Sequence, residues 1–167
     1  MDCVTSYASP LGEITLASGG AGLCGLWFEG QRRFGGSLAT DRSAGTSPAL
    51  EAARRWLDLY FRGEAPDFLP PLELRGTVFQ KAVWEALLEI PYGETVTYGA
   101  LAARLSQRLG RAVSPRAVGA AVGRNSISLV IPCHRVLGAN GSLTGYAGGL
   151  ERKRRLLELE AEGNILK

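Results

Sequence analysis

The sequence contains very little histidine, cysteine and methionine. It has 1 His, 3 Cys and 1 Met in 167 residues. A closed zinc site of nitrogen and sulfur ligands would have to borrow carboxylates or the third cysteine, so we expect no metal. The cysteines, Cys3, Cys24 and Cys133, are odd in number and widely spaced. They therefore predict no disulfide framework.

The chain also lacks a hydrophobic run of membrane-spanning length, and its first residues show no basic region followed by an apolar stretch. We therefore expect a cytoplasmic protein with no membrane partner. Hydrophobic residues make up 46% and charged residues 21%, a globular composition that excludes disorder as the dominant state.

Acidic charge is scarce in the second half. Residues 1–75 carry 7 Lys and Arg against 9 Asp and Glu, a net charge of −2, whereas residues 76–167 carry 12 against 7, a net charge of +5. A basic half is typical of a nucleic-acid partner, although so small a charge is about equally typical of a solvated surface. We place a domain boundary at residue 75, with a structural N-terminal domain before it.

The first half predicts a small antiparallel sheet followed by a helix. Strands are expected over residues 4–7, 13–17 and 23–28. A loop rich in Gly, Ser and Thr follows over residues 35–46. Ser47 and Pro48 then open a helix that ends at Gly63, with Tyr60 in the core.

The second half predicts three helices and the outline of a helix-turn-helix. A capping box predicts a helix over residues 77–89, and an N-cap residue begins each of the helices expected over 98–105 and 114–122. A polar loop over residues 106–113 separates the last two. The expected fold class is α+β: a small antiparallel sheet with a helix, then a mainly helical, winged-helix-like domain.

The helix opened by Ser114 and Pro115 has almost no side-chain bulk on its outer face along the run Arg116-Ala117-Val118-Gly119-Ala120-Ala121-Val122-Gly123. Its two glycines cost roughly 1 kcal/mol each relative to alanine. Gly119 could pack tightly against the core, or the backbone could approach a DNA groove. Arg116 in the first turn favours DNA, because a large cation there can enter a base stack, and the smooth face suits the minor groove.

Cys133 lies beside His134, the only histidine, in a run that we expect to be extended. A neighbouring imidazole or cation favours the thiolate, which is the nucleophilic form of cysteine. Taken alone, the pair is more typical of a buried structural cysteine, because neighbours in a strand point to opposite faces. A hairpin turn is predicted at residues 138–141. A final helix over 150–162 carries a basic cluster, most of whose charges are interpreted as a solvated face.

Several spaced motifs accompany this pair between residues 76 and 160. They are Thr77-Val78-Phe79-Gln80, Ile90-Pro91-Tyr92-Gly93, Arg116-Ala117-Val118-Gly119, Asn125, Pro132-Cys133-His134-Arg135-Val136, Tyr146 and Gly148-Gly149-Leu150. Together they resemble the O6-alkylguanine-DNA alkyltransferases, also called methylated-DNA–protein-cysteine methyltransferases. Ser126 departs from the proline that many members of that family have.

The resemblance implies that Cys133 accepts an alkyl group from O6 of a flipped guanine. His134 would act as the base through a water, Glu160 would orient it, and Asn125 would brace the cysteine loop. The implied DNA contacts are Arg116, which fills the gap left by the guanine, Tyr98, which pushes on the adjacent phosphate, and the helix residues Ala117, Gly119 and Ala120. The implied substrate contacts are the main chain of Val136, Tyr146 and Lys153.

The resemblance also implies one turnover per molecule without a cofactor, on double-stranded DNA approached from the minor groove. We expect a monomer; cooperative binding to DNA and the size of the preferred adduct stay open. A damage-binding protein without transfer activity is disfavoured by Cys133 itself. A cysteine hydrolase or thiol redox enzyme is disfavoured because the chain lacks a second histidine and a Cys-x-x-Cys pair.

Overall fold

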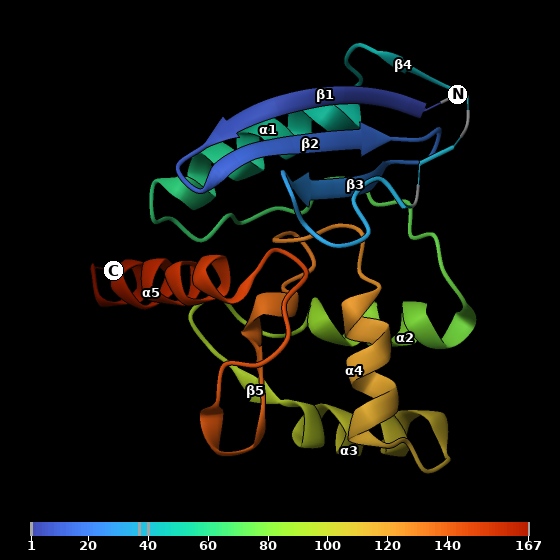
Figure 1. Ribbon diagram of the computed structural model, residues 1–167, viewed down its shortest axis with the longest axis vertical. Helices are drawn as coiled ribbons and strands as arrows, with labels where there is room; N and C mark the ends of the chain where they lie inside the picture. Colours follow the sequence, from blue (N-terminus) through green and yellow to red (C-terminus); the bar gives the residue numbers. More distant parts are fainter. Residues whose placement is uncertain (1, 37, 40, 167) are drawn as a thin grey trace.

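The computed structural model describes residues 2–36, 38–39 and 41–166, with residues 163–166 described by their backbone alone. A sheet covered by one helix lies above a group of shorter helices (Figure 1). This arrangement confirms the predicted α+β fold class. Among the described residues, no helix is both long and apolar enough to cross a membrane.

The sheet has four strands in the order β3-β2-β1-β4. They are β1 (Asp2–Ser9), β2 (Gly12–Ser18), β3 (Leu23–Phe28) and β4 (Arg42–Ala44). The first three form the predicted antiparallel meander, and β4 runs parallel to β1. The sequence did not predict β4, which lies in the expected loop, because all three of its residues are exposed and give no apolar alternation.

Helix α1 (Pro48–Phe61) covers one face of the sheet (Figure 1). The Ser47 side chain accepts a hydrogen bond from the backbone N–H of Leu50, and proline takes the first helical position, as predicted. Leu50, Leu57 and Tyr60 are fully buried against the sheet and the second half. Each buried side chain of this size contributes about 1.5–3 kcal/mol to folding.

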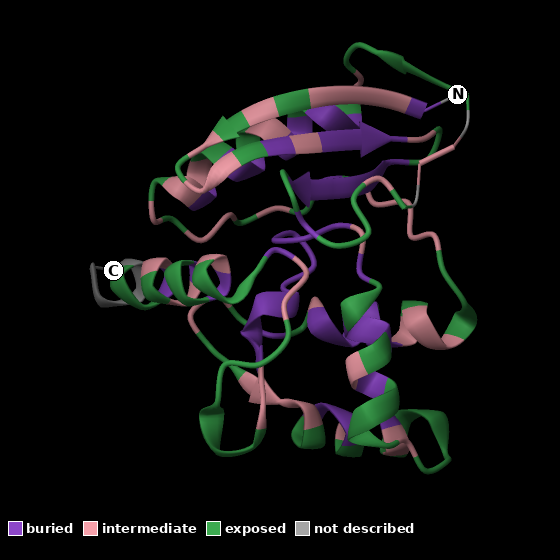
Figure 2. Ribbon diagram, viewed as in Figure 1, coloured by how far each residue is buried: buried purple, intermediate pink, exposed green. Residues whose placement is uncertain are grey.

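Strand β3 joins the two halves of the chain. The Leu26 N–H donates to the Ser126 carbonyl at 2.8 Å, and the Leu26 carbonyl accepts from the Ser128 N–H at 3.2 Å. One apolar cluster runs from Ile14 in the sheet to Leu156 near the C-terminus. Figure 2 shows these buried residues where the sheet meets the segments below it. The segment leading to the cysteine is therefore anchored to the sheet edge.

The second half begins with α2 (Val78–Leu87), α3 (Tyr98–Leu109) and α4 (Pro115–Gly123). The predicted capping box at the start of α2 is confirmed. The prediction that α3 ends at Leu105 is wrong. The Ser106 hydroxyl donates to the Ala102 carbonyl one turn earlier, Arg108 pairs with Glu89, and Gly110 in the left-handed conformation ends the helix.

Two further predictions concern the region after α4. Cys133–Arg135 forms a 3-10 turn, η1, so the expected extended run is wrong. The strand β6 (Val136–Leu137) that follows pairs in parallel with β5 (Val96–Thr97), and no described strand after it completes the predicted hairpin. Ala139–Gly141 instead forms a second 3-10 turn, η2. Helix α5 (Leu150–Leu166) ends the chain, beginning where it was predicted.

Candidate active site

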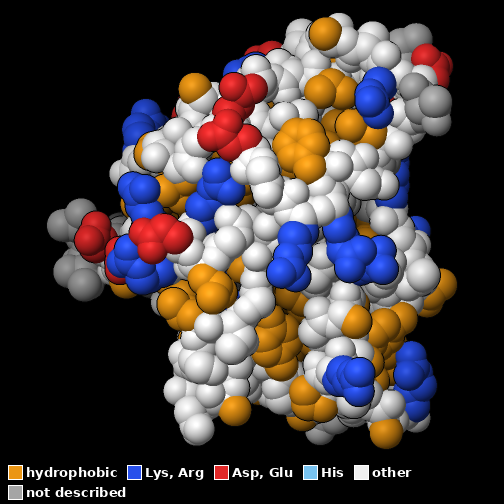
Figure 3. Space-filling view, viewed as in Figure 1, with side chains coloured by type: hydrophobic (Ala, Val, Ile, Leu, Met, Phe, Trp, Pro, Cys, Tyr) orange, Lys and Arg blue, Asp and Glu red, His pale blue; other side chains and the backbone are white. Residues whose placement is uncertain are grey.

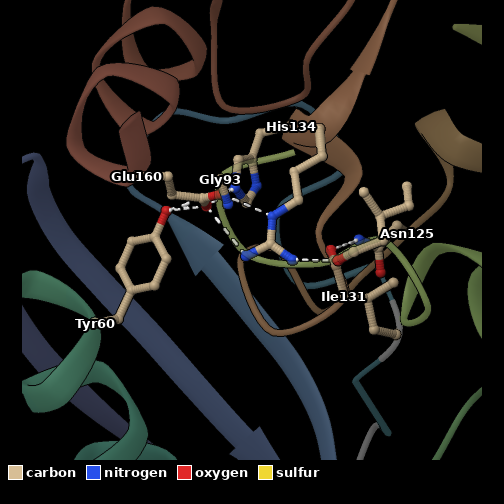
Figure 4. Close-up of polar contacts among 8 residues, drawn as sticks. Tyr60, Gly93, Asn125, Ile131, His134 and Glu160 are labelled. Carbon is tan, nitrogen blue, oxygen red and sulfur yellow. Dashed lines mark hydrogen bonds and ion pairs between the residues drawn. The ribbon is translucent and has the colours of Figure 1, made fainter. Parts of the chain in front are cut away.

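A tight irregular segment carries the chain from α4 to Cys133. Asn125, which is buried, holds it from inside: its Oδ1 accepts from the Ile127 N–H at 3.0 Å and its Nδ2 donates to the Ile131 carbonyl at 3.0 Å (Figure 4). Leu129 within this segment has a φ of 71°, a left-handed conformation that is rare for a leucine. The amide therefore holds a backbone that would otherwise relax.

The turn η1 places Cys133 and His134 in different surroundings. Cys133 lines a cavity of about 630 Å³ and is 5% exposed. His134 is fully buried, and its Nε2 lies 2.5 Å from Oε2 of Glu160 on α5. Its Nδ1 has no hydrogen-bond partner among the described residues. Because a carboxylate accepts, Nε2 carries the proton and Nδ1 is the nitrogen that can accept one.

Glu160 is the centre of a buried hydrogen-bond network (Figure 4). Its Oε1 accepts from the Gly93 N–H at 3.0 Å and from Arg135 Nε at 2.8 Å. Its Oε2 accepts from His134 Nε2, from the Tyr60 hydroxyl at 2.7 Å and from Arg135 Nη2 at 3.2 Å. The donors come from α1, the α2–β5 connection and η1, so the site is assembled from both halves of the chain.

The thiol and the imidazole are both neutral at rest. Burial raises the pKa of Cys133 above its usual value, although a hydrogen bond from Asn125 and the charge of Lys153 oppose the rise. Burial also lowers the pKa of His134, against the raising effect of Glu160. The thiolate is therefore not the resting form of Cys133, and a base has to take its proton when it reacts.

Glu160 stays ionised inside this network. Burial alone would raise the pKa of its carboxyl, but the interactions with His134 and with the Arg135 guanidinium outweigh burial and lower that pKa to about 2. An ionised carboxylate behind a neutral imidazole can stabilise the imidazolium that forms when Nδ1 takes up a proton.

Lys153 is not one of the solvated charges that were expected to make up most of the basic cluster on α5. It is fully buried, and its Nζ donates to the carbonyls of Val136 at 2.6 Å, Thr144 at 2.8 Å and Gly145 at 3.3 Å. Lys153 thus ties β6 to the glycine-rich loop, residues 143–149, that borders the cavity. Its neighbours Arg154 and Arg155 are exposed on the same helix.

Helix α4 presents a smooth exposed face. Arg116, Ala117 and Ala120 are exposed, and none of them lines the cavity. A Cβ added at Gly119 would lie 3.8 Å from the Tyr98 ring, an ordinary contact, so internal packing does not require that glycine. Figure 3 shows Lys and Arg side chains across the middle and lower right of this view, with Asp and Glu to its left and top.

The cavity brings several of the expected residues together. Tyr98, Gly119, Asn125, Cys133 and Tyr146 all line it. His134, Glu160, Val136 and Lys153 lie behind its wall, and Arg116 lies outside it on α4. The expected site residues thus form one connected region: one group lines the cavity, and the other is buried behind it.

Sequence reasoning missed the contributions of the N-terminal half. Gly30, Arg32 and Arg33 line the same cavity, and the Arg32 N–H donates to the Ala147 carbonyl at 3.1 Å. Tyr60 was expected to be core, and it is buried, but its hydroxyl also reaches Glu160. The sequence held one signal for this contact. A buried tyrosine hydroxyl needs a hydrogen-bond partner, and phenylalanine would have filled the same core position without one.

Arg152 on α5 was also missed as a structural link. Its Nε donates to the Leu11 carbonyl at 3.0 Å, and its Nη1 donates to the carbonyls of Glu29 at 3.1 Å and Gly148 at 3.2 Å. Its guanidinium also lies 4.8 Å from the centre of the Phe28 ring. The residue therefore connects the sheet to the rim of the cavity.

No group of three or more His, Cys, Asp or Glu side chains among the described residues is arranged to hold a metal ion. The chemistry available at the site is that of a buried thiol with an imidazole and a carboxylate behind it. This set matches the nucleophile, base and orienting group of an activated cysteine.

Both halves of the chain match known family models. Residues 78–162 match the model described as 6-O-methylguanine DNA methyltransferase, DNA binding domain. Residues 3–74 match the model described as 6-O-methylguanine DNA methyltransferase, ribonuclease-like domain. The two matched ranges meet close to the boundary expected at residue 75.

Similar proteins cover nearly the whole chain. The methylated-DNA–protein-cysteine methyltransferase of Mycobacterium tuberculosis is 47% identical over 154 residues, which are 91% of this chain and 88% of the relative. That of Methanosarcina acetivorans is 45% identical over 155 residues, 92% of this chain and 95% of the relative. The crystal structure of Mycobacterium tuberculosis OGT in complex with DNA superposes with a TM-score of 0.83 at 43% identity, covering 96% of this chain and 94% of that one. This chain therefore belongs to the 6-O-methylguanine DNA methyltransferase family.

Proposed function

We propose that this protein repairs alkylated DNA directly, by moving an alkyl group from O6 of guanine onto Cys133. The observation that carries the proposal is the position of Cys133, which faces a cavity of about 630 Å³ while the buried His134–Glu160 pair lies behind it. A guanine can reach this thiol only after it leaves the base stack, so the reaction requires nucleotide flipping.

The proposed transfer uses only groups of the chain and the DNA. The thiol proton passes through one water to His134 Nδ1, and the resulting imidazolium is stabilised by Glu160. The sulfur of Cys133 forms a bond to the alkyl carbon, and the bond from that carbon to O6 breaks with its electron pair going to guanine. The guanine anion then takes up the proton that the imidazolium releases through solvent. The thioether product has no leaving group, so each molecule acts once and needs no cofactor.

The proposed DNA contact is the smooth face of α4 in the minor groove, where small residues let the backbone approach closely. Arg116 would enter the stack in place of the flipped guanine, Tyr98 would press on the neighbouring phosphate, and Ala117 and Ala120 would follow the groove. The main chain of Val136 would read the base edge. This assigns DNA binding and transfer to residues 76–167. A DNA substrate would place the protein inside the cell, and the cytoplasm is the proposed compartment.

The remaining roles at the site belong to the same proposal. Asn125 would brace the cysteine segment, for which its two 3.0 Å hydrogen bonds to the backbone are the support. Tyr146 would line the base pocket, and Lys153 would hold the loop that follows β6. Gly119 would keep the floor of the cavity free of a side chain.

A stoichiometric labelling experiment tests the proposal. A fixed amount of the protein, or of Cys133→Ala, is mixed with increasing amounts of duplex DNA that carries one O6-methylguanine labelled in the methyl group. We expect protein-bound label to saturate near one per wild-type molecule and to be absent from the variant. Tight binding to the lesion without transfer would instead indicate a damage sensor, and many transfers per molecule would contradict the single-turnover mechanism.

A further inference from the structure

We infer that Tyr60, on α1 of the N-terminal half, is a positioning residue for the Glu160–His134 pair. Its hydroxyl holds one carboxylate oxygen of Glu160 against the imidazole, so the N-terminal half takes part in the chemistry rather than only in stability. The inference rests on the proposed alkyl transfer for its kinetic consequence. The geometry on which it stands does not depend on that function.

The contacts join three side chains that are almost entirely removed from solvent. Tyr60 and His134 are 0% exposed and Glu160 is 1% exposed. The Tyr60 hydroxyl donates to Oε2 of Glu160 at 2.7 Å, and the same oxygen lies 2.5 Å from His134 Nε2. The hydroxyl oxygen is also 3.5 Å from that nitrogen (Figure 4). No water can easily replace the phenol at such a site.

The hydroxyl supplies a constraint that the other donors do not. Oε1 is fixed by the Gly93 N–H and by Arg135 Nε. Without Tyr60, Oε2 would be divided between His134 and the Arg135 guanidinium, whose planar fork favours drawing both oxygens toward itself. Holding Oε2 at Nε2 keeps the proton on that nitrogen. Nδ1 is then the basic nitrogen, which the proposed proton transfer needs.

Core packing accounts for an aromatic ring at position 60 but not for the hydroxyl group that Tyr60 carries. The ring stacks on Trp56 with centroids 5.2 Å apart and meets Phe61 and Tyr92 edge-on at 5.3 and 6.0 Å. A phenylalanine would keep all three contacts. Tyr60→Phe therefore removes a single hydrogen-bond donor from Glu160 and leaves the core filled.

The other ionisable groups around the pair are not changed by this substitution. They are Tyr92, Cys133, Arg135, Tyr146 and Lys153, from the α2–β5 connection, η1, the glycine-rich loop and α5. A difference between wild type and Tyr60→Phe at the imidazole can thus be assigned to the lost hydroxyl.

The chain provides a matched control. The Tyr7 hydroxyl donates to Oδ1 of Asp58 at 2.6 Å, which is also a tyrosine–carboxylate bond between the sheet region and α1. Neither Tyr7 nor Asp58 lines the cavity. Tyr7→Phe therefore removes the same kind of bond from the same half of the protein without touching the site.

The first measurement is single-turnover transfer from O6-methylguanine duplex as a function of pH, together with the affinity for the same duplex. We expect Tyr60→Phe to lower the plateau rate about tenfold, the loss expected for one hydrogen bond to a charged group. The acid limb of the pH–rate profile should move to lower pH, because an Oε2 drawn toward Arg135 stabilises the imidazolium less. DNA affinity should stay unchanged, and Tyr7→Phe should match wild type.

The second measurement needs no activity. His134 is the only histidine in the sequence, so the nitrogen resonances of histidine-labelled protein report on it without assignment. We expect the Nε2–H tautomer in wild type and in Tyr7→Phe, and altered tautomer populations or a lowered imidazole pKa in Tyr60→Phe. Unchanged histidine resonances in a folded Tyr60→Phe would overturn the inference, even if transfer slowed. If wild type itself failed to transfer the methyl group, only the proposed function would fall, since the resonances still decide the role of Tyr60.

Discussion

Replacing Lys153 by methionine probes the buried back of the cavity. Methionine keeps the length and the apolar stem of the side chain and removes the charge together with three hydrogen bonds to the carbonyls of Val136, Thr144 and Gly145. The substitution therefore separates the ammonium group from simple space filling.

The stability effect follows from two opposing contributions. Each hydrogen bond from a charged donor stabilises by about 1.5–3 kcal/mol, whereas removal of a buried ammonium recovers a desolvation penalty of several kcal/mol. The loss of three hydrogen bonds, less the recovered desolvation penalty of one ammonium, lowers the free energy of unfolding by about 3 kcal/mol. For a protein of this size, that loss lowers the melting temperature by roughly 6–12 °C.

Lys153 also affects stability through its own protonation. Burial lowers the pKa of its ammonium below the usual value. The unfolded chain then binds more protons than the folded one at alkaline pH, so wild-type stability gains from this residue as the pH rises toward the unfolded pKa. Lys153→Met lacks that gain. Loss of the positive charge also raises the pKa of the Cys133 thiol further, so transfer should become slower.

Thermal unfolding of Lys153→Met and of Lys81→Met, measured between pH 7 and pH 10, provides the assay. Lys81 is exposed on α2, so its replacement should change the free energy of unfolding by less than about 0.5 kcal/mol. A Lys153→Met protein as stable as Lys81→Met, with wild-type transfer kinetics, would refute the reasoning.

Three further predictions concern the surroundings of the cavity. Asn125→Ala should lower stability by about 2–4 kcal/mol in denaturant unfolding, because the backbone of Ile127 and Ile131 loses its two 3.0 Å bonds; a loss below 1 kcal/mol would show that Asn125 is no brace. The Glu160 carboxyl, with a pKa of about 2 against 4.5 unfolded, contributes about 3 kcal/mol that is present above pH 4.5 and lost as the pH falls toward 2. Unfolding of Glu160→Gln should lack this acid-dependent loss, and an unchanged acid profile would contradict the assignment. Arg152→Lys should speed amide hydrogen exchange in the glycine-rich loop at the cavity rim, since the single nitrogen of a lysine cannot take the places of both Nε and Nη1; equal exchange in both proteins would count against the link.

Local sequence signals were enough to predict most of the fold. Ser47 with Pro48, and Thr77 with Gln80, mark helix starts through side-chain bonds within one turn, and both pairs act as expected. The extension of α3 could not be read in this way. Its polar residues resemble a loop, and the Arg108–Glu89 pair that supports them is a tertiary contact.

The cysteine site was predictable as a set of residues but not as a geometry. The motif around Cys133 indicated the nucleophile and its partners, whereas the 3-10 turn that turns His134 toward Glu160 has no local signature. Tyr60 lies 100 residues before Glu160, and Lys153 sits among exposed arginines. Both are defined by contacts that only the folded chain creates.

The most direct test of the central claim is to locate the alkyl group on the protein. After reaction with duplex DNA that carries O6-methylguanine, the protein is digested and its cysteine peptides are examined by mass spectrometry. We predict one added methyl group, on the peptide with Cys133, while the peptides with Cys3 and Cys24 stay unmodified. Methylation of Cys3 or Cys24 at the same rate, or transfer that persists in Cys133→Ala, would contradict the account.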